Sequence, residues 1–302
     1  MRKKIFILAL ALLSFNFLSA SEAPWHGEGR IAISSDGNDH DDDDWAATPV
    51  SLAILCAKGL QDKLAVYTYS DHIWGNNTKL DGYGEMQESA LKGAEYFSFD
   101  KSRFICAVDD PQKAYEAMAK AINDSSEHNP LFIIGAGPMQ VIGEAIKLSD
   151  KDKLQYVSLT SHSKWNDNHG KEHGGWTLDM IEKEFTQYGL TIFRILDQNG
   201  NRYTTKAEKY EGIFADVERF DWLKTSPAKD KAPYKAGSWD WLYSRLESCK
   251  RGINKKRNWT KPSFDASDSG MLIFLLTGEE KTNVDMLKEI LENPVGASSL
   301  TK

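Results

Sequence analysis

Six aspartates fall within nine positions early in the chain, in the segment DGNDHDDDD at residues 36–44. Ionised carboxylates this close repel one another strongly when they are partly removed from water, so we expect a cation among them. Hard divalent ions such as calcium and magnesium take carboxylate and carbonyl oxygens as ligands. The alternative is a solvated acidic loop that caps the next helix. Capping needs one aspartate rather than six, so we favour a metal site. His40 lies among these oxygen donors, and we therefore do not expect it to bind zinc.

The acidic run follows an apolar segment, 30–34, that is typical of a buried strand, and it precedes an alanine-containing helical pattern. This order of strand, aspartate, glycine-containing turn, Asp-Asp pair and helix resembles the calcium-binding signature of the nucleoside hydrolases and their relatives. Two later segments are similar to that family in the same order. LFIIGAGPMQVI at 131–142 resembles its strand, Gly-Pro turn and helix, and DASDSGMLIFLL at 265–276 resembles the segment that supplies a last carboxylate.

The resemblance implies a role for each matching residue. Asp36 would bind the ion and accept a proton from its bound water. Asp43 would bind sugar hydroxyls, and Asp44 would bind the metal. The backbone carbonyl of Ala136 and the carboxylate of Asp268 would complete the metal site.

The chain also departs from the family pattern. The loop after Asp36 is longer, so Asp39 or Asp41 could take the role of base or ligand, and we include Asp41 among the expected ligands. Gln140 and Val141 replace a Thr-Asn pair. Ser267 replaces a histidine that helps a nucleobase depart in family members that have it, which weakens the case for nucleobase chemistry.

Polar residues follow two other predicted strands, at 64–70 and 154–160. Trp74 is a stacking platform for a sugar or base, or else a residue that packs its loop onto the core. Gly75-Asn76 matches a Gly-Asn turn that the family places near the sugar. After the second strand, His162 or His169 is our candidate acid for the leaving group. The substrate-binding residues we expect are Asn38, Asp43, Trp74, Asn76, Asn166 and Asn168.

Alternating strand and helix patterns must position these residues. Strands are expected at 30–34, 64–70, 103–108, 131–134, 154–160 and 190–196, and helices at 45–58, 84–97, 111–123, 138–148 and 178–188. The alternation predicts an α/β fold with a mostly parallel central sheet and helices on both faces. The resemblance implies that this fold is similar to that of the nucleoside hydrolases. The ligand crevice of such sheets lies beyond the carboxyl ends of the strands. A Trp- and Lys-rich part follows from about 200 to 302, with helices at 239–249, 269–276 and 284–291, and we expect residues 21–302 to form a single domain.

Composition narrows the function further. The 302 residues carry 37 Lys+Arg against 44 Asp+Glu, a net charge of −7, which argues against a nucleic acid polymer as partner.

Residues 1–20 have the basic start, apolar middle and small final residue of a signal peptide, and their apolar run is too short for a membrane anchor. Three widely spaced cysteines indicate neither a disulfide framework nor a zinc ribbon.

These observations predict an exported, periplasmic or extracellular hydrolase that depends on a divalent cation, with calcium the ion we expect. An Asp36-activated, metal-bound water would attack the anomeric carbon of a glycosidic or N-ribosidic bond in a small sugar or nucleoside. The alternative is a calcium-dependent carbohydrate-binding protein without turnover. Cleavage of a phosphoester is a weaker third hypothesis, because the net negative charge of the protein disfavours an anionic substrate. We expect no membrane partner, and the oligomeric state stays open.

Overall fold

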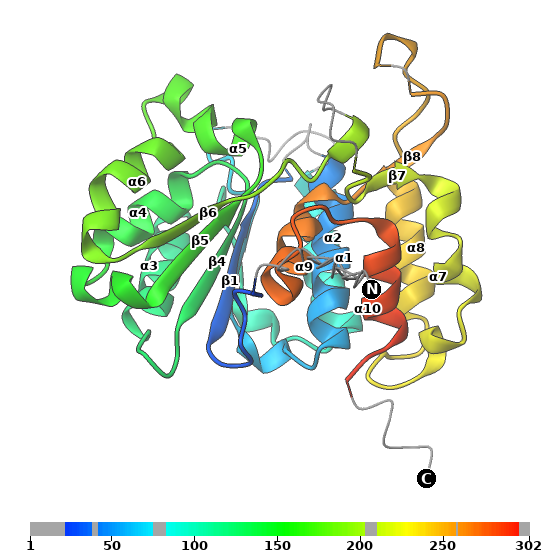
Figure 1. Ribbon diagram of the computed structural model, residues 1–302, viewed down its shortest axis with the longest axis horizontal. Coiled ribbons are helices and arrows are strands. Elements are labelled where there is room, and N and C mark those ends of the chain that lie inside the picture. The colour runs from blue at the N-terminus through cyan, green and yellow to red at the C-terminus, as the bar shows by residue number, and fades with distance from the viewer. Residues whose placement is uncertain (1–21, 38–41, 75–82, 203–209, 258, 296–302) are drawn as a thin grey trace, which may run out of the picture.

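Six parallel strands form the central sheet of the protein (Figure 1). The computed structural model describes residues 22–37, 42–74, 83–202, 210–257 and 259–295. The strand order is β3-β2-β1-β4-β5-β6, so the chain runs outward from β1 to one edge and then outward to the other. The strands are β1 (Arg30–Ser35), β2 (Leu64–Tyr69), β3 (Phe104–Cys106), β4 (Leu131–Ala136), β5 (Val157–Ser161) and β6 (Thr191–Arg194). The predicted α/β fold with a parallel sheet is confirmed.

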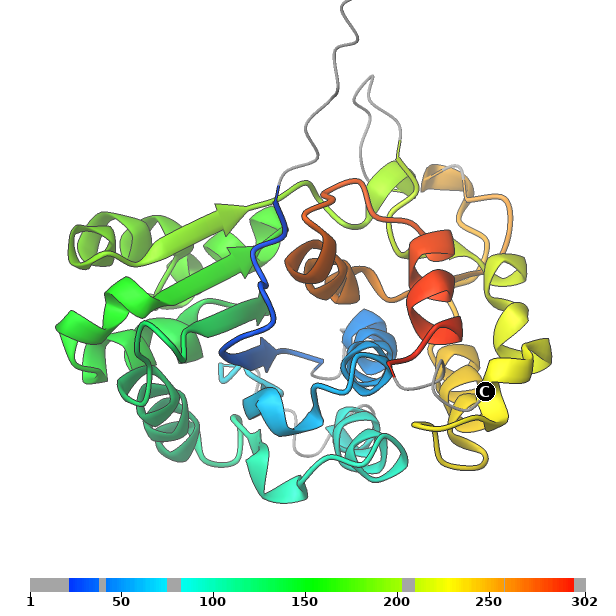
Figure 2. The same cartoon turned by 60° about the horizontal axis from the view of Figure 1, so that its bottom comes forward.

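Helices cover both faces of the sheet (Figures 1 and 2). Successive strand residues point to opposite faces, so Ile31 and Ile33 join one apolar core and Ala32 joins the other. The first core packs against α1 (Asp42–Ala57), α2 (Tyr83–Tyr96), α8 (Ser238–Ser248), α9 (Gly270–Thr277) and α10 (Val284–Glu292). The second packs against α3 (Pro111–Asn123), α4 (Gln140–Leu148) and α6 (Leu178–Phe185).

The late part of the chain adds a second, two-stranded sheet that the sequence analysis did not predict. β7 (Phe214–Asp216) pairs antiparallel with β8 (Ser263–Asp265). Strands of three residues carry too little alternation to be recognised from sequence. The short helix α7 (Trp222–Thr225) and α8 lie beside them, and Trp239 of α8 is fully buried.

Several predicted boundaries were wrong by a few residues. Helix α1 begins at Asp42, three residues before the predicted start, so the last three aspartates form its first turn instead of a loop. Carboxylates are stabilised there by the positive end of the helix dipole. Residues 154–156 lie in a 3₁₀ helix, Lys151–Tyr156, and the strand begins only at Val157.

Some sequence-based predictions lie outside the described residues. These are the signal peptide at 1–20 and the candidate residues Asn38, Asp39, His40, Asp41 and Asn76. Within the described ranges, no helix is both long and apolar enough to cross a membrane.

Candidate functional site

Asp36 directly follows β1 at the carboxyl edge of the sheet, where its side chain is buried. Its backbone is fixed by both neighbouring strands. The Asp36 amide donates to the carbonyl of Ala136 (3.3 Å), and the carbonyl of Asp36 accepts from the Ser70 amide (2.9 Å). Ser70 adopts a φ of 52°, in the left-handed region that non-glycine residues seldom occupy. The backbone at Asp36 is therefore held between the ends of β4 and β2.

Asp44, in the first turn of α1, lies against the end of β1. Gly37 has a φ of 83°, and a Cβ there would lie 2.9 Å from the Cβ of Asp44, so position 37 needs glycine. The Ser35 hydroxyl donates to Oδ1 of Asp44 (2.6 Å). The indole of Trp45 donates to the carbonyl of Gly37 (2.7 Å) and so ties the first turn of α1 to the residue that follows Asp36.

Asp268 reaches the same point from the far end of the chain. It lies in a 3₁₀ turn, Ser267–Ser269, that packs against α1 and leads into α9. Oxygens of Asp36, Asp44 and Asp268 all lie within 4.8 Å of one another, and all three side chains are buried. We call these three residues the carboxylate triad. The structure thus brings together three of the ligands expected from the sequence.

The charge of the triad is costly without a cation. Burial raises the pKa of Asp44 well above its usual range, and the nearby charges of Asp36 and Asp268 raise it further. A divalent cation would offset this repulsion, and carboxylate oxygens at the end of a strand are the donors that calcium and magnesium prefer. The donor set therefore fits a hard divalent ion rather than zinc. The carbonyl of Ala136 lies beside Asp36, and it accepts the Asp36 amide, which leaves its second lone pair for a ligand.

His162, which follows β5, is hydrogen-bonded to the triad. Its Nε2 faces Oδ1 of Asp268. Its Nδ1 accepts from the Gln198 amide (3.1 Å) when the ring is neutral, and in the protonated ring it can only donate, toward Oδ1 of Asp197 (3.6 Å). Burial lowers the pKa of His162, but hydrogen bonds and charge from Asp197 and Asp268 outweigh burial and raise it to about 10. Because an ionised carboxylate only accepts, Nε2 carries the proton in either state of the ring. His162 therefore lies in the site as predicted, with both ring nitrogens facing protein groups.

The comparisons with known proteins cover most of the chain. No protein-family model matches it. It is 30% identical over 276 residues to "Uncharacterized protein P22" of Formosa agariphila, and the match covers 88% of this chain and 91% of the relative. The chain belongs to the P22 family. The match extends over nearly the whole length of both chains and is not confined to one motif.

Arg251 is a member of the site in this P22-family chain that the sequence analysis missed. Its guanidinium pairs with Asp42 (2.7 Å) and Asp43 (3.1 Å) at the start of α1, and it lies 3.9 Å from Asp265. Burial raises the pKa of Asp43 to about 6, because the lowering effect of Arg251 is smaller and Asp268 adds repulsion. Asp43, the predicted binder of hydroxyls, therefore lies beside the triad with an arginine as its partner.

Asp265 and Asp71 are two further buried carboxylates that the sequence analysis did not assign. Burial and the charge of Asp43 raise the pKa of Asp265. Asp71, just after β2, accepts from the Ser34 hydroxyl (2.6 Å). A Cβ at Gly137 would lie 2.3 Å from Oδ1 of Asp71, so the glycine of the Gly-Pro turn makes room for this carboxylate. Both residues could have been found from their places in the sequence. Asp71 follows a predicted strand, and Asp265 lies in the same motif as Asp268.

The remaining predicted residues occupy different places. Asn166 is buried and donates to the carbonyl of Gly135 (3.4 Å) near the end of β4. Asn168 is exposed and donates to the Lys164 carbonyl of its own short helix, α5 (Lys164–Asn168). Trp74 stacks on His173, with ring centroids 4.6 Å apart. His169, the other candidate acid, lies beside His72, and burial followed by the charge of His173 lowers its pKa.

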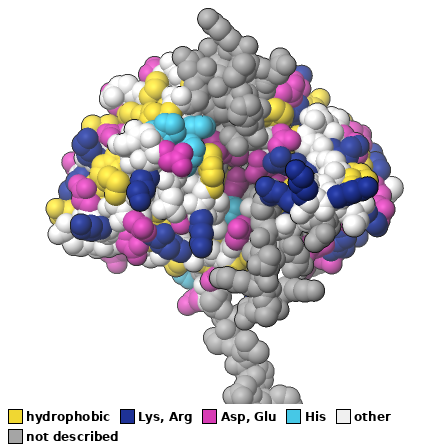
Figure 3. All heavy atoms as spheres, turned by 90° about the horizontal axis from the view of Figure 1, so that it is seen from above, with side chains coloured by type: hydrophobic (Ala, Val, Ile, Leu, Met, Phe, Trp, Pro, Cys, Tyr) yellow, Lys and Arg dark blue, Asp and Glu magenta, His cyan; other side chains and the backbone are white. Residues whose placement is uncertain are grey.

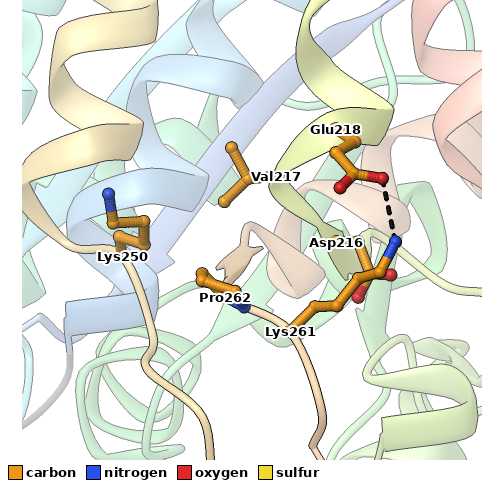
Figure 4. Close-up of a pocket in the computed structure, with 6 residues that line it drawn as sticks. All are labelled: Asp216, Val217, Glu218, Lys250, Lys261 and Pro262. Carbon is orange, nitrogen blue, oxygen red and sulfur yellow. Dashed lines mark hydrogen bonds and ion pairs between the residues drawn. The ribbon is translucent and has the colours of Figure 1, made fainter.

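Figure 3 views the protein from above relative to Figure 1. This is the side on which α5 and the carboxyl ends of the strands lie. Acidic side chains gather in the middle of this face next to a group of histidines, and basic side chains lie on both sides (Figure 3). A separate surface pocket is lined by Asp216, Val217, Glu218, Lys250, Lys261 and Pro262, and Lys261 pairs with Glu218 across it (2.9 Å, Figure 4). Its lining includes no member of the triad, so this pocket is distinct from the candidate site.

Proposed function

We propose that the protein hydrolyses a glycosidic or N-ribosidic bond of a small sugar or nucleoside, and that it needs a divalent cation, calcium, to do so. The observation that carries this proposal is the buried carboxylate triad at the carboxyl edge of a parallel sheet, with Asp36 at the end of the first strand. The resemblance of its three motifs to those of the nucleoside hydrolases supports the same chemistry.

Asp36, Asp44 and Asp268, with the carbonyl of Ala136, would hold the cation. When bound, the ion supplies positive charge that offsets the carboxylates and makes a nearby water more acidic. Asp36 accepts the proton of that attacking water, because it stands at the end of the first strand, where the nucleoside hydrolases that this chain resembles place the aspartate that takes this proton. Asp43, which lies near Asp268, and Asn166, which binds the backbone near the end of β4, bind sugar hydroxyls in this proposal.

His162 serves in this proposal to position Asp268. Its pKa of about 10 makes it a poor proton donor near neutral pH, and its Nε2 proton already binds Asp268. The prediction that His162 protonates the leaving group is kept as the competing role, and the variants in the Discussion separate the two.

The second candidate is calcium-dependent carbohydrate binding without turnover. The observation that favours it is the same imidazole, since a ring held between Asp268 and the Gln198 amide has no nitrogen turned to a leaving group. Ser267, where nucleoside hydrolases with base chemistry carry histidine, is consistent with this alternative.

Hydrolysis assays with nucleosides and with aryl glycosides, each with calcium and with a chelator, test the proposal. We expect calcium-dependent release from one class of substrate and its loss by about 10²–10⁴-fold in Asp36→Asn, which cannot accept a proton. Asp240→Asn, at a carboxylate that is 62% exposed in a surface ion pair, is the matched control. Calcium-dependent sugar binding with no turnover in any of these assays would favour the second candidate.

A further inference from the structure

Three histidines outside the carboxylate triad converge at the same edge of the sheet. His72 follows β2, whereas His169 and His173 belong to the 3₁₀ segment His169–His173 that follows α5. Strands β2 and β5 are not neighbours, because β1 and β4 lie between them. The loops that carry these residues therefore reach toward each other across the strand ends. We call the three residues the imidazole cluster.

The ring nitrogens of the cluster are close enough to share one ion. Nε2 of His72 and Nε2 of His169 are 2.9 Å apart, and one nitrogen of each of the three rings lies within 4.8 Å of the others. Two nitrogens bound to one tetrahedral zinc at the usual Zn–N distance are about 3.3 Å apart. A small rotation of the rings would bring all three nitrogens to that separation.

Two tryptophans pack against the rings. Trp165 stacks on His169 (centroids 4.2 Å apart, planes at 21°), and Trp74 stacks on His173 (4.6 Å, 10°). Both indoles also meet His72 edge-on, at 5.9 and 6.1 Å. His72 and His169 are half-buried and His173 is exposed, so the cluster is supported from within and open toward solvent.

We propose that His72, His169 and His173 form a second metal site, which binds one zinc ion through three imidazole nitrogens and leaves a fourth position open to solvent. Imidazole nitrogen suits zinc, copper and nickel, whereas calcium and magnesium take oxygen ligands. Three histidines with an open position are the ligand pattern of exchangeable zinc sites. The edge of the sheet thus carries a hard-ion site at the triad and a nitrogen site beside it. This proposal does not depend on hydrolysis.

Zinc titration by calorimetry tests the proposal, using full-length protein with its purification tag removed and calcium present to fill the triad. We expect one zinc per chain in the wild type. His173→Ala removes an exposed side chain, which leaves the fold intact, and should weaken zinc binding at least about 10-fold, since even partners of ligands are worth that much. His169→Ala should do the same. His128→Ala, at an exposed histidine outside the cluster, should bind zinc as the wild type does.

Cobalt substitution gives a second readout, because cobalt held in a tetrahedral site of nitrogen ligands absorbs visible light strongly. We expect this absorption in the wild type and its loss in His173→Ala. The proposal is wrong if the wild type binds no zinc, or if zinc binding is unchanged in both His169→Ala and His173→Ala. It is also wrong if zinc binding survives in these variants and is lost in Asp268→Asn, which would place the ion in the triad.

Discussion

Nε2 of His162 donates a hydrogen bond to Oδ1 of Asp268, a residue 106 positions later in the chain. This contact ties the loop after β5 to the turn that opens α9, and both side chains are buried. It fixes the one triad member that comes from the late part of the chain. The geometry of the candidate metal site therefore depends on an imidazole that is not itself a ligand.

Replacement of His162 separates positioning from acid catalysis. His162→Ala leaves a buried carboxylate without its partner, so we expect a loss of about 3–5 kcal/mol in the free energy of unfolding and weaker calcium binding. His162→Gln keeps an N–H donor for Asp268 and should recover most of both. Denaturant unfolding and calcium titration measure these effects, with His128→Ala as the control. If His162→Gln binds calcium normally but has lost turnover, His162 is the leaving-group acid and our assignment is wrong.

The stability of the calcium-free protein should fall as the pH rises. Burial raises the pKa of Asp43 to about 6, and it raises that of Asp44 as well, so the folded state favours their protonated forms. Such groups contribute stability that is complete below their unfolded pKa near 3.8 and is lost as the pH rises through the folded value. The pKa of His162, raised to about 10, acts in the same direction above about pH 6.5.

We therefore expect the free energy of unfolding in chelator to fall by an amount on the order of 2 kcal/mol between about pH 5 and about pH 8. The melting temperature should drop over the same interval. Calcium should remove most of the drop, because it binds the ionised carboxylates. Asp44→Asn should flatten the pH dependence in chelator. A melting temperature in chelator that rises over this interval would contradict the assignment of raised pKa values.

Arg251 should compete with the metal for the acidic start of α1. Arg251→Gln removes the cation that pairs with Asp42 and Asp43, so the calcium-free protein should lose stability and calcium should stabilise the variant more than the wild type. Arg251→Lys keeps the charge and serves as the control. Thermal melts of the three proteins, each with and without calcium, measure both effects. An equal calcium-induced shift in all three would show that Arg251 does not interact with the site.

Gly137→Ala should damage the site without replacing any of the expected ligands. The added Cβ would lie 2.3 Å from Oδ1 of Asp71 and 2.8 Å from the amide of Asp36, so one of them must move. We expect a cost of about 1–3 kcal/mol and weaker calcium binding. In Gly84→Ala the new Cβ meets open space on α2, and alanine should stabilise this helix slightly. Wild-type calcium affinity in Gly137→Ala would show that the Gly-Pro turn does not shape the site.

The central sheet could be predicted from the sequence, because the spacing of apolar residues and the residue types of each strand and helix are local signals. Buried strands such as 131–136 carry a continuous apolar run, and α3 has an N-terminal proline and apolar residues at helical spacing. Asp36, Asp44 and Asp268 were predicted because each stands in a motif with a known order. Their distance from one another could be learned only from the structure.

Contacts between distant, isolated residues were not predictable in the same way. Arg251 has no motif, and its meeting with Asp43 depends on β8, a strand of three residues that pairs with the backbone at Arg251. His72 and His169 are 97 residues apart, and only the crossing of two loops over the strand ends joins them. Such sites depend on topology, which spacing along the chain does not encode.

Calcium binding by variants of the triad tests the central claim most directly. Calorimetric titration of the chelator-treated protein should give one calcium per chain, and Asp36→Asn, Asp44→Asn and Asp268→Asn should each weaken it, with the largest loss for Asp44 or Asp268. Asp240→Asn should bind calcium as the wild type does. If the wild type binds no divalent cation, or if none of the three triad variants changes the affinity or the stoichiometry, the carboxylate triad is not a metal site and the proposed function fails with it.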